Sequence, residues 1–181
     1  SHFGISPRRM RSLYVHFPFC ESKCHYCDFY SIGAERTADS DPLLFEKAMF
    51  AESTAQAPRL GPADGPKLET IFFGGGTPSM TPPESMARAL APLELGRRTD
   101  ENTEWTMEAN PSSVDRARLE AYRAFGVNRI SMGVQALRPD LLTMLGRVHS
   151  RDAAFAAKQA LLKRDYNALL DLGGNEIGRA S

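Results

Sequence analysis

Strand-like and helix-like segments alternate along this chain, and this alternation restricts the folds it can adopt. In residues 12–18 the apolar side chains of Leu13, Val15 and Phe17 alternate with polar ones, as in a half-buried strand. Further strands are predicted at 68–73, 103–109 and 129–134, and helices at 41–57, 82–93, 113–125, 139–146 and 151–163. Strands separated by helices predict an α/β fold, with a parallel sheet and helices outside it.

The length limits how much of such a fold the chain can form. The chain has 181 residues, whereas a closed barrel of eight strand–helix units takes about 250. Because four units and the start of a fifth can be counted, we predict a partial, truncated parallel (β/α) barrel. The expected regions are a lead-in at 1–11, a core domain at 12–164 and an atypical tail at 165–181, with disorder of the tail left open.

Composition and charge exclude several functional classes. The 22 basic residues equal the 22 acidic ones, so no overall positive field favours nucleic acid or an anionic membrane. No apolar run approaches the roughly 18 residues of a membrane helix. No apolar region typical of a secretory signal opens the sequence. These features predict a globular, cytoplasmic protein that binds no nucleic acid.

Chemically distinctive residues follow each predicted strand. Cys20 follows the first strand, residues 74–77 the second, residues 108–110 the third, and Gln135 the fourth. In parallel α/β folds the active site lies at the carboxyl ends of the strands. We therefore expect these residues to meet at one edge of the sheet.

The chain has three cysteines, Cys20, Cys24 and Cys27, with the spacing C-x3-C-x2-C. An odd number of cysteines in one short segment argues against a disulfide framework. Thiolates at this spacing on one loop can hold three corners of an iron–sulfur cube, which leaves the fourth iron open to a small molecule. A zinc ion held by the thiolates with His16 or His25 is an alternative, and a loop of free thiols is another.

Five segments in sequence order share a more specific pattern. They read Tyr-Val-His-Phe-Pro-Phe-Cys at 14–20, Phe-Gly-Gly-Gly-Thr-Pro at 73–78, Glu-Ala-Asn-Pro at 108–111, Gly-Val-Asn-Arg-Ile-Ser-Met-Gly-Val-Gln at 126–135 and Leu-Gly-Arg-Val-His at 145–149. Together with the cysteine motif, they resemble the radical S-adenosylmethionine proteins. More narrowly, they resemble the branch that contains oxygen-independent coproporphyrinogen III oxidase and the heme chaperone HemW. The resemblance covers about residues 12–150 and implies that the core domain is a partial radical-SAM barrel.

The resemblance implies a [4Fe–4S] cluster on Cys20, Cys24 and Cys27, with S-adenosyl-L-methionine on the open iron. Other residues match family positions that contact this cofactor. They are Gly75, Gly76 and Thr77 at its amino group, Glu108 at its ribose, Tyr26 at its adenine, Tyr14 at a further contact, and Gln135 and Arg147 at a second cofactor molecule.

Simpler interpretations stay open for several of these residues. Glycines most often form an ordinary turn, Glu108 can be a structural carboxylate, and Arg147 can be a solvated arginine at a helix end. Asp171 matches a family aspartate less well, because it lies one residue closer to Arg147 than expected.

The residues after the cysteine motif favour the chaperones within this branch. Cys27 is followed by Asp-Phe-Tyr-Ser, whereas the oxidases resemble Cys-Gly-Cys, so Phe29 stands where they have an extra cysteine. The resemblance implies that the protein binds heme as cargo and passes it to an acceptor protein. It also implies an electron donor for the cluster and peripheral membrane contact through the acceptor. The oxidase is the first alternative and a zinc-stabilised binding module the second, and whether the chain is an enzyme stays open.

Overall fold

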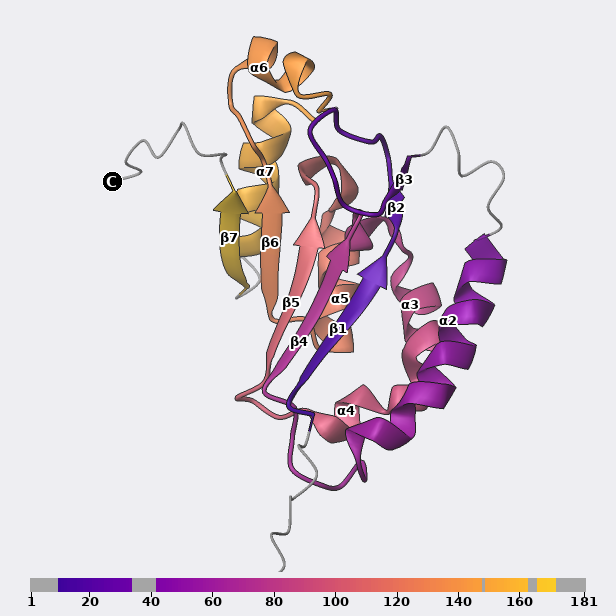
Figure 1. Cartoon of the computed structure of the whole chain (residues 1–181). Coiled ribbons are helices and arrows are strands. Elements are labelled where there is room, and N and C mark those ends of the chain that lie inside the picture. The colour runs from indigo at the N-terminus through magenta and orange to yellow at the C-terminus, as the bar shows by residue number, and fades with distance from the viewer. Residues whose placement is uncertain (1–9, 34–41, 148, 163–165, 172–181) are drawn as a thin grey trace, which may run out of the picture.

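A five-stranded sheet forms the centre of the molecule. The computed structural model describes residues 10–33, 42–147, 149–162 and 166–171. The strand order is β1-β4-β5-β6-β7, and every neighbouring pair is parallel (Figure 1). The strands are β1 (Ser12–Phe17), β4 (Thr70–Gly75), β5 (Glu104–Ala109), β6 (Arg129–Gly133) and β7 (Asn167–Asp171). The predicted α/β class with a partial parallel barrel is confirmed, including the start of a fifth unit.

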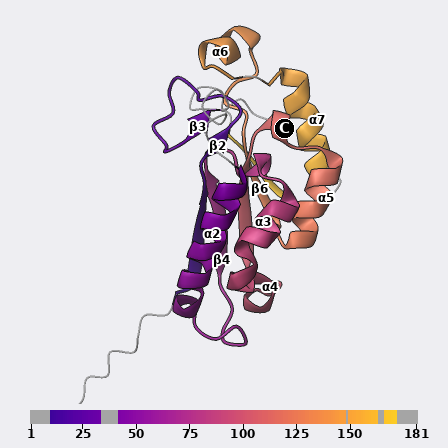
Figure 2. The same cartoon turned by 90° about the vertical axis from the view of Figure 1, so that its right-hand side faces the viewer.

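Helices cover one face of this sheet in the described part of the chain. Figure 2 shows α3, α5 and α7 on one side of the strands, and α2 packs against α3. The bounds are α2 (Pro42–Gln56), α3 (Pro83–Leu90), α5 (Arg116–Phe125) and α7 (Arg151–Leu162). Shorter elements are α4 (Leu95–Arg98), α6 (Pro139–Met144), and the 3-10 turns η1 (Ala57–Leu60), η2 (Pro78–Met80), η3 (Ala91–Leu93) and η4 (Pro111–Ser113). No helix in these described stretches is both long and apolar enough to cross a membrane.

The hydrophobic core lies between the sheet and these helices. Phe73, Trp105 and Met107 are at most 2% exposed, and the rings of Phe73 and Trp105 meet edge to face at 5.5 Å. Burial of each such side chain contributes about 1.5–3 kcal/mol. Because side chains alternate along a strand, burial of Trp105 and Met107 against the helices turns Glu108 to the opposite face. This orientation of Glu108 agrees with the sequence pattern.

The last described strand lies inside the predicted tail. β7 pairs with β6 in a register that places Asp171 opposite Gly133, at the carboxyl edge of the sheet. Residues 1–9 of the predicted lead-in and residues 172–181 of the predicted tail lie outside the described residues. The domain boundaries near 11 and 164 stay predictions.

Candidate functional site

The carboxyl ends of the strands surround a cavity of about 200 Å³. Ten of the eleven predicted site residues line it: Cys20, Cys24, Tyr26, Cys27, Gly75, Gly76, Thr77, Glu108, Gln135 and Arg147. Tyr14 is the exception. It lies on β1 with 57% of its surface exposed, and its hydroxyl pairs with Nδ1 of His16 at 2.9 Å. The expected gathering at one edge of the sheet therefore holds for every predicted residue but Tyr14.

The cysteine loop is fastened to the sheet at several points. Two short strands, β2 (Phe19–Cys20) and β3 (Ile32–Gly33), pair in parallel at the base of the loop. The amide of Ile32 donates to the carbonyl of Pro18 at 2.7 Å. Within the loop, the amide of Cys27 donates to the carbonyl of Cys24 at 3.1 Å. These bonds close the base of the loop and shape the segment that carries the three thiols.

The two histidines of this region connect the loop to its surroundings. His16 pairs through Nδ1 with Tyr14 and through Nε2 with the carbonyl of Tyr30, each at 2.9 Å. His25 Nδ1 lies 3.3 Å from the carbonyl of Met144 in α6. No three Cys, His, Asp or Glu side chains of the described residues converge to hold a single metal ion. Since both ring nitrogens of His16 are already engaged, His16 acts here as a structural link and not as a free metal ligand.

A third link was not predicted from the sequence. Ser112 in η4 donates through its hydroxyl to the carboxylate of Glu21 at 2.8 Å. Ninety-one positions separate these two residues, so no local pattern indicates the contact. It ties the cysteine loop to the segment that follows β5.

The glycines at the end of β4 are required by packing against β1 and β2. Gly75 has φ +113°, and a Cβ on it would lie 2.6 Å from the His16 ring. A Cβ on Gly76 would lie 2.7 Å from the carbonyl oxygens of both Pro18 and Phe19. The amide of Thr77 donates to the carbonyl of Phe19 at 2.7 Å. The glycines therefore let this segment pass directly over the start of the cysteine loop, and their contact with a cofactor stays a prediction.

Glu108 presents a partly buried carboxylate to the cavity. Burial raises its pKa, whereas the Gly75 amide and the nearby His16 act in the opposite direction. The Gly75 amide donates to Oε2 at 3.1 Å. Burial, and then the charge of Glu108, also raise the pKa of Tyr14. A carboxylate in such a place is stabilised by hydroxyl donors from a ligand.

Gln135 and Asp171 form the wall of the cavity next to β6. Gln135 adopts a left-handed backbone with φ +69°, which costs a residue other than glycine about 1–3 kcal/mol. The Asp171 carbonyl accepts from the amides of Val134 and Gln135 at 2.9 and 2.7 Å. Nε2 of Gln135 donates to Oδ2 of Asp171 at 2.9 Å. β7 thus holds the strained turn, and Asp171 joins the site through strand register.

Arg147 reaches from the end of α6 into the cavity. Its Nη1 donates to Sγ of Cys24 at 3.4 Å, and its Nη2 donates to the carbonyl of Gly133. Its Nε is buried and has no partner among the described residues. Arg147 is therefore no solvated arginine at a helix end. The unpaired N–H leaves a donor for a polar ligand.

Tyr26 and Cys20 have pKa values raised by burial. The pKa of Tyr26 rises to about 12 through burial and the neighbouring Cys24, against the influence of Arg147. The pKa of the Cys20 thiol is raised mainly by burial, and the hydrogen bond from Thr77 opposes this effect. The cavity combines three thiols, a carboxylate and a buried unpaired N–H. This set of groups fits an iron–sulfur cluster with a polar organic ligand.

Comparison with known proteins identifies the family. The model of the radical SAM superfamily matches residues 14–175. The chain is 40% identical over 175 residues to "Radical S-adenosyl methionine domain-containing protein 1, mitochondrial" of Bos taurus, covering 92% of this chain and 38% of that protein. It is 38% identical over 164 residues to the heme chaperone HemW of Escherichia coli, covering 89% of this chain and 42% of that protein.

A solved structure shows the same fold. The coproporphyrinogen III oxidase HemN of Escherichia coli superposes with a TM-score of 0.79 at 26% identity, over 92% of this chain and 37% of that one. The chain thus spans about two fifths of the length of the curated relatives. The match to the superfamily model covers the cysteine loop and all five strand ends that form the cavity. The chain belongs to the radical SAM superfamily.

Proposed function

We propose that Cys20, Cys24 and Cys27 bind a [4Fe–4S] cluster and that the cavity beside them binds S-adenosyl-L-methionine. The main support is that the three thiols share one cavity with Glu108 and Arg147. When bound, the reduced cluster supplies one electron for cleavage of a carbon–sulfur bond of the sulfonium. The electron comes from a separate one-electron donor of low potential.

The residues of this chain hold and orient these groups. Glu108 accepts hydroxyl donors of the ligand, since its carboxylate is turned toward the cavity by the alternation of β5. The aromatic ring of Tyr26 lies beside the thiols at the cavity wall and offers a surface for a planar base. Gln135 and Asp171 fix the wall next to β6. Tyr14 lies outside this cavity, and its role as a cofactor contact stays a prediction.

We further propose that the protein is a heme chaperone, which binds heme and passes it to an acceptor protein. Two observations support this proposal. Relatives named HemW are 31–38% identical to the chain. In addition, Phe29 lines the cavity where the oxidases are expected to have a cysteine. A phenyl ring can neither ligate iron nor relay a proton, so chemistry that depends on that thiol is absent. We expect peripheral contact with a membrane through the acceptor.

The oxidase stays the second candidate, because the solved structure that superposes at a TM-score of 0.79 is a coproporphyrinogen III oxidase. The two candidates differ in one assay. A version extended to the length of the relatives is reduced without oxygen and mixed with coproporphyrinogen and S-adenosyl-L-methionine. The chaperone proposal predicts no protoporphyrinogen at catalytic turnover. It also predicts transfer of bound heme to an apo-heme protein. Turnover without heme transfer would overturn it in favour of the oxidase.

Location in the cell stays a prediction. We propose the cytoplasm, and the mitochondrion is the other candidate, because the bovine relative is named as mitochondrial. Fractionation of cells that express the tagged natural protein distinguishes the two compartments.

A further inference from the structure

We infer that Arg147 raises the reduction potential of the cluster by donating a hydrogen bond to the Cys24 thiolate. Arg147 is a positioning residue in this role, because it acts through a cluster ligand and not on the substrate. The inference rests on the proposed cluster and adds a role to Arg147 that the family resemblance does not imply.

The contact itself is direct. Nη1 of Arg147 lies 3.4 Å from Sγ of Cys24, within hydrogen-bond range for sulfur. A guanidinium keeps its charge at any pH that proteins tolerate, so the bond to a thiolate is charge-assisted. Hydrogen bonds to the sulfur ligands are among the main determinants of the potential of an iron–sulfur cluster. Because reduction adds one negative charge, a fixed cation beside the ligand stabilises the reduced form more than the oxidised form.

The chain around Arg147 holds the guanidinium in this position. Helix α6 ends at Met144, and Gly146 just beyond it has φ +69°. The amide of Arg147 donates back to the carbonyl of Leu142 at 2.9 Å. This arrangement is the glycine-terminated helix end that redirects the chain sharply. A Cβ on Gly146 would touch the His25 ring at 3.4 Å, so the turn lies against the cysteine loop. The turn thereby directs the Arg147 side chain toward Cys24.

Gly133 completes the path of the side chain. The Gly133 carbonyl accepts from Nη2 of Arg147. A Cβ on Gly133 would lie 2.9 Å from the same nitrogen. Glycine at this position therefore leaves room for the guanidinium between β6 and the cysteine loop. A methyl group at position 133 would move the guanidinium while leaving its charge intact.

A second, weaker donor contacts another of the cysteines. The hydroxyl of Thr77 donates to Sγ of Cys20 at 3.6 Å. This donor is neutral, and neutral donors give about half the strength of charged ones. The structure therefore predicts that loss of the Arg147 donor changes the reduction potential of the cluster more than loss of the Thr77 donor does.

The test is a redox titration of the reconstituted cluster, monitored by electron paramagnetic resonance without S-adenosyl-L-methionine. Each variant of the whole chain is first analysed for iron and sulfide. Arg147→Met should lower the ratio of reduced to oxidised cluster about tenfold at a fixed poise, equal to about 59 mV for one electron. Arg147→Lys, which keeps the charge without the planar fork, should shift the midpoint by less than half as much. Gly133→Ala and Thr77→Val should shift it in the same direction by smaller amounts.

The outcomes separate this inference from the proposed function. Arg147→Met and Gly133→Ala can both contain full iron and sulfide and still show the wild-type reduction potential. That result overturns the inference and leaves the cluster assignment intact. If Arg147→Met assembles no cluster, Gly133→Ala and Arg147→Lys decide, and an unshifted midpoint in both overturns the inference. A wild-type chain that assembles no cluster overturns the proposed function and this inference together. Since the cofactor is absent from the titration, a role of Arg147 in cofactor binding alone predicts no shift.

Discussion

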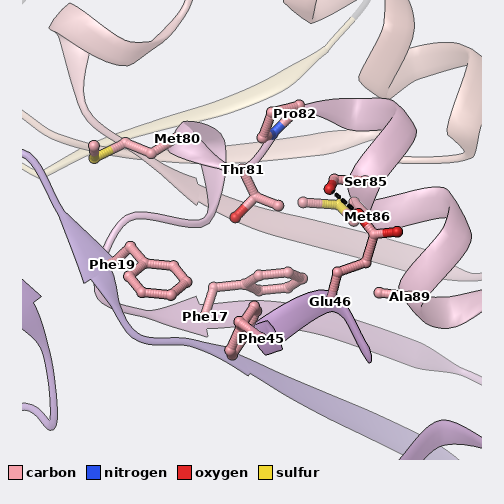
Figure 3. Close-up of a pocket in the computed structure, with 10 residues that line it drawn as sticks. All are labelled: Phe17, Phe19, Phe45, Glu46, Met80, Thr81, Pro82, Ser85, Met86 and Ala89. Carbon is pink, nitrogen blue, oxygen red and sulfur yellow. Dashed lines mark hydrogen bonds between the residues drawn. The ribbon is translucent and has the colours of Figure 1, made fainter. Parts of the chain in front are cut away.

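Two cavities of similar size differ in chemistry, although neighbouring residues of β2 line them. Cys20 lines the proposed cluster site, a cavity of about 200 Å³, and Phe19 lines an apolar cavity of about 280 Å³. Figure 3 shows this second cavity between the aromatic rings of Phe17, Phe19 and Phe45 and the start of α3. Because the apolar cavity is the larger one, volume does not identify the functional site. The chemistry of the side chains that line each cavity identifies it.

The carboxylates of the two cavities make the contrast sharper. Glu46 in the apolar cavity accepts from Arg88 at 2.7 and 2.9 Å and also from Ser85. These partners lower its pKa to about 2. In contrast, the pKa of Glu108 in the cluster site is raised by burial. A carboxylate whose oxygens are paired with protein donors is typical of a structural role. A carboxylate with a raised pKa in a polar cavity is typical of a site that binds a ligand.

The largest expected effect comes from the thiols of the cluster site. We predict that Cys20→Ala, Cys24→Ala and Cys27→Ala each lose nearly all bound iron and sulfide after anaerobic reconstitution, because the cluster loses a ligand. Met80→Leu in the apolar cavity is the matched control and should retain both. Circular dichroism checks that each variant is folded. A single cysteine variant with wild-type iron and sulfide would show that the ligand assignment is wrong.

The next effect tests how tightly the backbone of the cluster site is fixed. Gly75→Ala should lower the free energy of unfolding by about 1–3 kcal/mol, because its positive φ and the His16 ring both oppose a side chain. Gly96→Ala is the control. A Cβ on Gly96 meets nothing within 4 Å, so we expect no loss and a gain of up to about 1 kcal/mol in its helix. Urea denaturation measures both. Equal stability of the two variants would mean that the rim of the cluster site is not constrained.

Filling the apolar cavity tests whether it is only a packing gap. Ala89 lines this cavity and is 3% exposed. Ala89→Leu should raise the free energy of unfolding by about 1 kcal/mol, as cavity-filling substitutions commonly do. Iron and sulfide content should not change. A gain in stability together with a loss of bound iron would show that the two cavities are coupled and would contradict their separation.

The smallest effects concern the pH dependence of the two carboxylates. Glu46 has a lowered pKa, so its contribution to stability is present above the unfolded pKa and is lost as the pH falls toward about 2. Glu108 has a raised pKa, so its contribution is present below the unfolded pKa and is lost as the pH rises through the folded pKa. The two carboxylates therefore predict opposite pH dependences.

Stability curves of glutamine variants test these signs. Glu46→Gln should be less stable than the wild type at neutral pH, and the difference should vanish in acid. Glu108→Gln should be more stable than the wild type at neutral pH, by less than about 1 kcal/mol, because the hydrogen bond from Gly75 offsets part of the burial cost. Urea midpoints at several pH values measure both differences. Curves that move in the same direction for both variants would contradict the contrast.

The sequence predicted the sheet and the edge that holds the site because both depend on local patterns. Alternation in β1 and β5 reflects a sheet with one buried face, and parallel strands bring their carboxyl ends together. The cysteine spacing likewise needs no distant partner. These patterns place Cys20, Gly75 and Glu108 around one cavity, as the structure has them.

Contacts between distant segments could not be predicted in this way. Asp171 enters the site through the register of β7 against β6, and its spacing from Arg147 in the sequence gave no clear match. His25 and Met144 are separated by 119 positions, and Arg147 and Cys24 by 123. Arg147 meets Cys24 because Gly146 turns the chain just after α6 and Gly133 leaves room for the guanidinium. Such contacts depend on packing in three dimensions, and the spacing of hydrophobic residues along the sequence does not predict them.

Metal and sulfide analysis of the wild-type chain distinguishes an iron–sulfur cluster on the three thiols from a zinc site. The chain is purified and reconstituted without oxygen, and iron, acid-labile sulfide and zinc are measured together. We predict a brown protein with about four iron and four sulfide per chain and little zinc. A colourless protein with about one zinc per chain and no sulfide would contradict it, because the three thiols would then form a structural zinc site.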